Sequence, residues 1–138
     1  MLLRHSAIVN GDVDSVFKAL TDASVVAECL SEAKLQAVDG KGFSGTFAVR
    51  LGPLRLNFSG TGRLSGNDAA RRQVTIRARG RDHDHDSDLD LRLITRCVDD
   101  DGARLCFSAE LDIRGKAAVL GKGFVVEQFS QIVEDFAA

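Results

Sequence analysis

The residues best suited to metal or acid–base chemistry are crowded into residues 82–88, which read Asp-His-Asp-His-Asp-Ser-Asp. In an extended chain His83 and His85 would share one face, so two imidazoles and a carboxylate could bind a divalent metal. However, the stretch falls where two strands meet in a hairpin, and it lacks the glycine and distal glutamate of an EF-hand loop. We therefore expect a solvated hairpin without a dedicated metal site.

One further histidine and three cysteines are the remaining candidates for catalysis. His5 falls on the same side of its expected strand as Leu3 and could point inward. Cys29, Cys97 and Cys106 have no metal-ligand spacing and no histidine close in sequence, and the chain contains neither a G-x-S-x-G nor a Walker motif. We interpret the cysteines as free thiols of a reducing cytoplasm and expect no catalytic residue.

Length and composition limit the other options. The chain has 138 residues, of which 44% are hydrophobic and 28% charged, and its net charge is −2. This is typical of one globular domain, residues 1–138, and gives no reason to expect a nucleic-acid partner. No apolar run approaches the roughly 18–20 residues that span a bilayer, and Arg4 interrupts the N-terminus before a signal-peptide core could form. We expect a cytoplasmic protein, with a peripheral position at the inner face of the membrane left open.

Alternating apolar and polar residues dominate the middle of the chain and predict strands. Around Gly52-Pro53 the apolar positions change from odd to even numbers, as a two-residue turn requires if both strands are to share one apolar face. The strands that flank residues 99–102 both have odd inward positions, so their loop should hold an odd number of residues. Strands are predicted at residues 2–9, 34–39, 43–51, 54–64, 71–81, 87–98 and 103–114.

Helical patterns are confined to the two ends of the chain. Two short helices follow the first strand, the first capped by Gly11 or Asp12 and the second by Thr21 or Asp22. A single long helix is predicted over residues 116–137. The fold class is therefore α+β, a seven-stranded curved antiparallel sheet with its helices on one face.

The predicted inner face of the sheet is poor in large side chains. Glycine or alanine stands at Gly45, Gly60, Gly62, Ala78, Gly80, Ala103 and Ala109. These residues could serve only to let the sheet curl, with the long helix filling the space. Alternatively, they leave a lipophilic cavity under the helix. The phenylalanines that could wall such a cavity favour it, and they are Phe17, Phe43, Phe47, Phe58, Phe107, Phe124 and Phe129.

Short motifs, in order along the chain, carry a resemblance to a known family. They are Val13-x-x-Val16-Phe17-x-x-Leu20, Cys29-Leu30, Leu51-Gly52-Pro53-Leu54, Phe58-Ser59-Gly60-Thr61-Gly62 and Gly115-Lys116-x-x-x-Leu120-Gly121. With the order of the elements, they make the chain resemble the helix-grip superfamily (START/Bet v 1-like, SRPBCC). Within it, the chain looks like the CoxG family, named after a carbon monoxide dehydrogenase component. The resemblance covers nearly the whole chain and implies a helix-grip fold that encloses a cavity.

The resemblance also implies a function without catalysis. Such a protein would hold a lipophilic small molecule, a quinone or a lipid, under the long helix, as an accessory to a molybdenum hydroxylase of the carbon monoxide dehydrogenase type. The chain departs from the family pattern in having Ser31-Glu32 for a usual Pro-Gly, residues 82–88 for a glycine-rich hairpin, and no extension after Ala138. We therefore expect weak or no membrane association, no metal, and no cofactor beyond a bound quinone or lipid.

Pattern and resemblance together predict the residues that surround the ligand. They are His5, Phe17, Leu20, Leu30, Phe43, Phe47, Phe58, Gly60, Ala78, Leu91, Phe107, Gly121, Val125 and Phe129.

Two other functions stay open. A cyclase or hydratase of the same fold, acting on an aromatic polyketide, would need polar groups inside the pocket, where only His5, Thr95 and Ser31-Glu32 are available. A protein-interaction module without a ligand would use the outer face of the sheet. That face is predicted to carry Arg50, Arg55, Arg63, Arg77, Arg79, Arg81, Arg92, Arg96, Arg104 and Arg114, with Asp90, Glu110 and Asp112 as their cross-strand partners.

Overall fold

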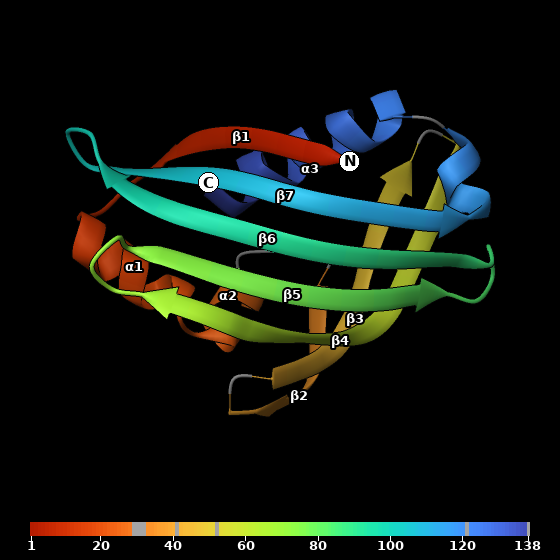
Figure 1. The fold of residues 1–138 in the computed structure, drawn as a ribbon, viewed down its shortest axis with the longest axis horizontal. Coiled ribbons are helices and arrows are strands. Elements are labelled where there is room, and N and C mark those ends of the chain that lie inside the picture. Colours follow the sequence, from red (N-terminus) through yellow and green to blue (C-terminus); the bar gives the residue numbers. More distant parts are fainter. Residues whose placement is uncertain (29–32, 41, 52, 121, 138) are drawn as a thin grey trace.

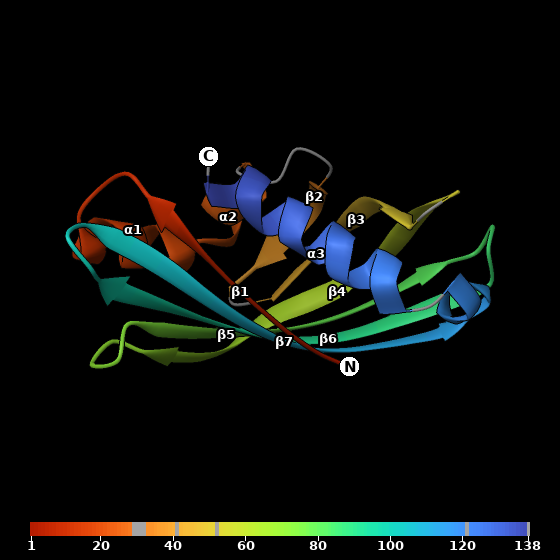
Figure 2. The same ribbon diagram turned by 90° about the horizontal axis from the view of Figure 1, so that it is seen from above.

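The structure, a computed structural model, describes residues 1–28, 33–40, 42–51, 53–120 and 122–137. A curved antiparallel sheet has the strand order β1-β7-β6-β5-β4-β3-β2, and the helices lie on its concave side (Figures 1 and 2). The predicted α+β arrangement is confirmed. The elements are β1 (Leu2–Val9), α1 (Val13–Leu20), α2 (Ala23–Glu28), β2 (Ala33–Asp39), β3 (Gly42–Leu51), β4 (Leu54–Asp68), β5 (Gln73–Asp82), β6 (Ser87–Asp99), β7 (Ala103–Gly115), the 3-10 helix η1 (Lys116–Leu120) and α3 (Lys122–Ala137).

Strand pairing follows the predicted register. The β3–β4 pairs run from Gly42–Arg63 to the turn at residues 52–53, which keeps both apolar sets on the inner face. The β6–β7 pairing ends at Asp99–Ala103 and leaves an odd-numbered loop, as the alternation predicted. Sequence parity was sufficient here because a slip of one residue would turn every apolar side chain of a strand toward water.

β4 is the strand around which the sheet changes direction. Its residues 54–63 pair with β3 and its residues 59–68 pair with β5, so residues 59–63 are flanked on both sides. The strand continues beyond its predicted end at residue 64, with a register shift between Leu64 and Gly66. In Figure 1, β3 and the first half of β4 turn steeply away from the direction of β5, β6 and β7.

A row of glycines crosses the sheet at this bend. Gly45, Gly60 and Gly80 are direct partners on the inner face of β3, β4 and β5. A Cβ atom on Gly60 would overlap the carbonyl oxygen of Arg79, and one on Gly45 would overlap that of Lys34. Only glycine lets neighbouring backbones approach so closely. At these positions the small residues therefore serve the curvature of the sheet.

The two short helices begin where the sequence predicted. Asp12 is the N-cap of α1, and its carboxylate accepts the backbone N–H of Ser15 at 2.9 Å. Asp22 accepts the backbone N–H of Ser24 at 2.9 Å at the start of α2. Both caps satisfy N–H groups that have no partner within the helix.

The C-terminal helix is shorter than predicted. Instead of one helix over residues 116–137, the chain forms η1 and then α3. Ala117 in η1 is buried, and its N–H donates to Ser87 Oγ at 2.9 Å. A contact with the hairpin between β5 and β6 therefore shapes this first turn, which helical periodicity could not show. Gly123, a poor helix former, lies close to the start of α3.

Gly60→Ala should destabilise the fold by more than about 2 kcal/mol or prevent folding, because the new methyl group would overlap backbone atoms of β5. Gly42→Ala in β3 is the control, since the nearest atom to its Cβ would be at 3.5 Å, an ordinary contact. Its free energy of unfolding should change by less than about 0.5 kcal/mol. Urea denaturation measures both variants. Equal stability of the two would show that the bend does not require the glycine row.

Candidate functional site

A cavity of about 400 Å³ lies between the inner face of the sheet and α3. This volume is within the range of about 300–1,000 Å³ that is usual for small-molecule sites. Inward side chains of β3 to β7 form the floor, and Val125, Phe129 and Ile132 of α3 form the roof. Val26 of α2 and Leu35 of β2 complete one side.

Most of the side chains predicted to surround a ligand line this cavity. Phe17 is not among them, because it packs against the core cluster that contains Phe107. Phe124 also lies outside the lining and is 40% exposed. The predictions for Leu30 and Gly121 fall outside the described residues. The predicted residues that the lining does include are Leu20, Phe43, Phe47, Phe58, Gly60, Ala78, Leu91, Phe107, Val125 and Phe129.

His5 is placed differently from the expectation. It lies on the inward side of β1, between the buried Leu3 and Ala7, but it does not line the cavity. Its Nε2 is 3.0 Å from Oε1 of Glu134 on α3. The pair ties the edge strand β1 to the helix, so His5 positions the roof of the cavity. The pairing could not be read from the sequence, since the two residues are far apart along the chain.

Sequence reasoning left several lining residues out of the site. Ile76 and Leu93 stand at inward positions of β5 and β6, so the strand alternation could have identified them. Val26 and Leu35 come from α2 and β2, which are too short for their periodicity to show which side chains face inward.

The cavity offers very little polar chemistry. Thr95, at 4% exposure, is the one buried polar side chain among the described lining residues, whereas Lys34 and Arg79 at its edges are exposed. Cys97, the next inward residue of β6, is outside the lining, and its Sγ is 3.6 Å from the carbonyl oxygen of Val13. Burial raises the pKa of the Cys97 thiol, which keeps it protonated and unreactive.

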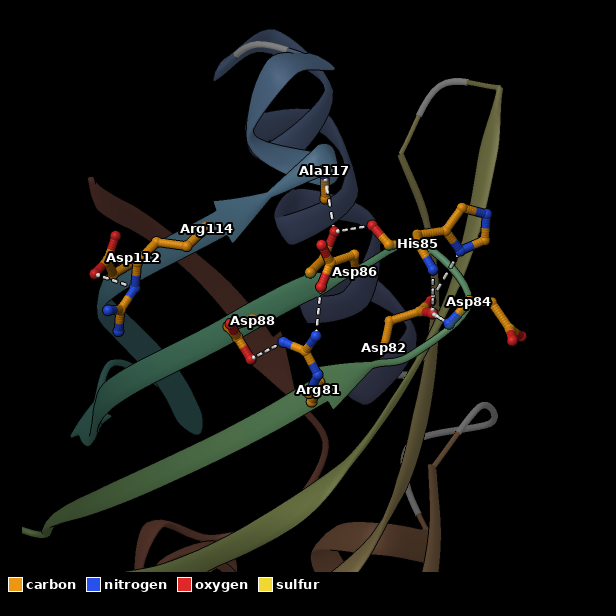
Figure 3. Close-up of polar contacts among 10 residues, drawn as sticks. Arg81, Asp82, Asp84, His85, Asp86, Asp88, Asp112, Arg114 and Ala117 are labelled. Atoms are coloured by element: carbon orange, nitrogen blue, oxygen red, sulfur yellow. Dashed lines mark hydrogen bonds and ion pairs between the residues drawn. The ribbon is translucent and has the colours of Figure 1, made fainter.

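The acidic hairpin of residues 82–88 is not the solvated loop that the sequence suggested. Asp82 is only 1% exposed. Its carboxylate accepts the backbone N–H groups of Asn57 at 2.8 Å, Asp84 at 2.9 Å and His85 at 3.0 Å, and lies 3.1 Å from His85 Nδ1 (Figure 3). Burial alone would raise the pKa of this carboxyl, but hydrogen bonds from Asn57 and His85 hold the pKa below its usual range.

The same hairpin fixes the start of the C-terminal helical segment. Ser87 Oγ donates to the carbonyl oxygen of His85 at 3.0 Å and accepts the N–H of Ala117 (Figure 3). Arg81 pairs with both Asp86 and Asp88 on the exposed side. The polar residues of the hairpin are therefore used within the fold. In the described part of the chain, no group of three or more His, Cys, Asp or Glu side chains is arranged to hold a metal ion.

The outer face of the sheet carries the predicted arginines, and only some of them are paired. Arg79 and Arg114 form ion pairs of 3.4 Å with Asp90 and Asp112. By contrast, one row places three exposed arginines directly opposite one another in β4, β5 and β6, and no ion pair joins them to a residue that the structure describes. These three, called the arginine row below, are Arg63, Arg77 and Arg92.

Comparisons with known proteins agree with this geometry. A family model for CoxG, a carbon monoxide dehydrogenase component, matches residues 6–138. None of the curated proteins matches the chain. No helix among the described residues is both long and apolar enough to cross a membrane.

Solved structures share the fold at low sequence identity. A conserved protein from Geobacillus kaustophilus is 14% identical, with a TM-score of 0.83 over 99% of this chain and 90% of that one. The Zhui aromatase/cyclase of a Streptomyces species is 16% identical, with a TM-score of 0.60 over 99% and 86%. Norcoclaurine synthase from Thalictrum flavum is 14% identical, with a TM-score of 0.62 over 100% and 96%. The predicted helix-grip (Bet v 1-like) fold is thereby confirmed.

Asp82→Asn should lower the free energy of unfolding by about 2 kcal/mol at neutral pH, because an amide cannot accept all the N–H groups that the carboxylate accepts. Asp84→Asn changes an exposed neighbour and should have little effect. Urea denaturation compares the two variants with the wild type.

The effect of Asp82→Asn should depend on pH. Because the pKa of Asp82 is lowered in the folded state, its contribution is complete above the ordinary value of 3.8 and is lost as the pH falls through its folded-state pKa. The stability difference between wild type and variant should therefore shrink in acid. A difference of the same size at neutral and strongly acidic pH would contradict the role of the charged carboxylate.

Proposed function

The chain belongs to the CoxG family of carbon monoxide dehydrogenase components, and from this premise we propose that it binds a lipophilic small molecule, a quinone or a lipid, in the cavity beneath α3. It catalyses nothing itself and serves as an accessory to a molybdenum hydroxylase of the carbon monoxide dehydrogenase type. The observation that carries the proposal is the cavity of about 400 Å³ with its apolar lining.

The lining favours an apolar ligand on energetic grounds. Phe43, Phe47 and Phe58 line one part of the floor, and Leu89 and Leu91 line another. Removing a ligand's apolar surface from water contributes about 25 cal/mol per Å² before the costs of association. Few groups are available to hydrogen-bond a polar molecule. An isoprenoid or acyl chain satisfies both conditions.

The distribution of titratable groups supports a role without catalysis. General acid–base chemistry needs a titratable side chain within hydrogen-bond reach of the substrate. Among the described lining residues, Lys34 and Arg79 are the only ones that titrate, and both are exposed. His5, the residue that a cyclase-like mechanism would have used, is engaged by Glu134. The cyclase and the synthase among the solved structures support the fold alone, since both are below 25% identity.

The arginine row favours a second function, the docking of a partner. Like charges opposite one another destabilise a sheet, and a partner with an acidic surface would relieve this repulsion. Attraction between exposed charges is screened beyond about 8–10 Å at physiological salt. An interaction that used Arg77 should therefore weaken both with added salt and in the Arg77→Gln variant.

A lipophilic molecule should accompany the protein through purification. Native mass spectrometry of protein purified without detergent should show a mass adduct that organic solvent extracts. The extracted molecule, or an added quinone or fatty-acyl probe, should then rebind in a stoichiometric complex. A clean mass without adduct, together with no binding of either probe, would contradict the proposal.

Ala78→Leu should weaken binding of the quinone probe by about tenfold or more, since the larger side chain occupies cavity volume that the ligand needs. Ala48→Leu is the matched control, because residue 48 lies on the opposite face of β3 from the lining residues Phe47 and Val49. Isothermal titration calorimetry measures both affinities, and thermal unfolding confirms that both variants fold. Equal weakening by the two substitutions would place the ligand elsewhere.

A further inference from the structure

Thr95 differs from all of its neighbours in the cavity. It lies on the inner face of β6, where Val74 and Phe107 are its direct partners across the sheet. Along β6 the adjacent inward residues are Leu93 and Cys97. All four neighbours are apolar, and valine would fill the same space as threonine without a hydroxyl group.

The Thr95 hydroxyl has no hydrogen-bond partner among the residues that the structure describes. It is nevertheless not sealed off, because no fully enclosed side-chain oxygen or nitrogen of the described residues lacks a partner. Its oxygen therefore reaches free space, and the free space that Thr95 lines is the cavity. A hydroxyl kept in apolar surroundings without a partner costs stability.

Thr95 stands where the cavity meets the packed core. Cys97 belongs to the core cluster under α1, and so does Phe107, the cross-strand partner of Thr95. Phe136 of α3 packs edge-on against Phe107, with 6.0 Å between ring centroids, and closes this end from above. The more polar lining residues, such as Lys34, lie in exposed positions. A ligand in the cavity thus meets one buried hydrogen-bonding side chain, at the closed end.

We propose that Thr95 anchors the buried end of the ligand by a hydrogen bond to a carbonyl or hydroxyl oxygen. This inference rests on the proposed function and narrows the ligand from any lipophilic molecule to one whose inserted end carries oxygen. A hydrocarbon end at the same place would leave the hydroxyl unpaired, so the site would discriminate against it.

Two probes that differ by one oxygen test the assignment. 2-Acetylnaphthalene carries a carbonyl group where 2-ethylnaphthalene carries a CH₂ group. Calorimetric affinities for both are measured with the wild type, Thr95→Val and Thr95→Ser. Thr75→Val on the outer face of β5 is the control for the substitution itself. The infrared carbonyl stretch of bound 2-acetylnaphthalene reports the hydrogen bond directly.

Thr95→Val should weaken binding of the ketone about three- to tenfold, the range of one neutral hydrogen bond, and leave the affinity for 2-ethylnaphthalene unchanged or higher. The carbonyl stretch should lie at lower frequency in the wild type and in Thr95→Ser than in Thr95→Val. Thr75→Val should behave as the wild type.

Three results would overturn the assignment. Equal weakening of both probes by Thr95→Val would show that Thr95 only shapes the cavity. Unchanged affinities and an unchanged carbonyl stretch would show that the hydroxyl makes no contact with the ligand. In both cases the proposed function survives, because the wild type still binds. Failure of the wild type to bind either probe, or the quinone and fatty-acyl probes, would overturn the proposed function and this inference together.

Discussion

The close approach of backbones at Gly45, Gly60 and Gly80 is the constraint on which the rest of the structure depends. Side chains at Gly45 and Gly60 would collide with neighbouring strands, so the sheet could not bend where β4 passes from β5 to β3. The bend carries β2 and β3 toward α3 and turns a sheet into a half-shell. Without it, the apolar face of the sheet would lie flat and would need to be covered by direct packing alone.

A bent sheet leaves volume under a helix only if the helix is held in place by something other than packing against the floor. Two polar contacts do this. The Ser87 hydroxyl, held in a hairpin that the buried Asp82 organises, receives the N–H of Ala117 just before α3. Nearer the other end of the helix, Glu134 contacts His5 of β1. The polar residues that first suggest catalysis or metal binding are thus part of the framework that keeps the roof above the cavity.

Much of the fold could be predicted from the sequence because its information is local. Period-two alternation on either side of Gly52-Pro53 determined the β3–β4 register, and Asp12 and Asp22 marked the helix starts. The floor of the cavity followed from the same parity.

The contacts that the sequence could not show join distant parts of the chain. Neither the burial of Asp82, which depends on Asn57 in another strand, nor the break between η1 and α3 leaves a periodic signal. The role of the small inward residues was open between curvature and cavity. The structure assigns Gly45 and Gly60 to curvature, whereas Ala78 and Leu91 face the remaining volume.

The central claim is that the volume beneath α3 is where a lipophilic ligand binds, and intermolecular NOEs test it most directly. With methyl-labelled protein and 2,3-dimethyl-1,4-naphthoquinone as the probe, contacts should appear to the methyl groups of Ile76, Leu93 and Val133, which line the cavity. No contact should appear to Ile8, which is 69% exposed on β1. NOEs confined to exposed methyl groups such as that of Ile8, or a saturated complex with no NOE to the lining, would contradict the account.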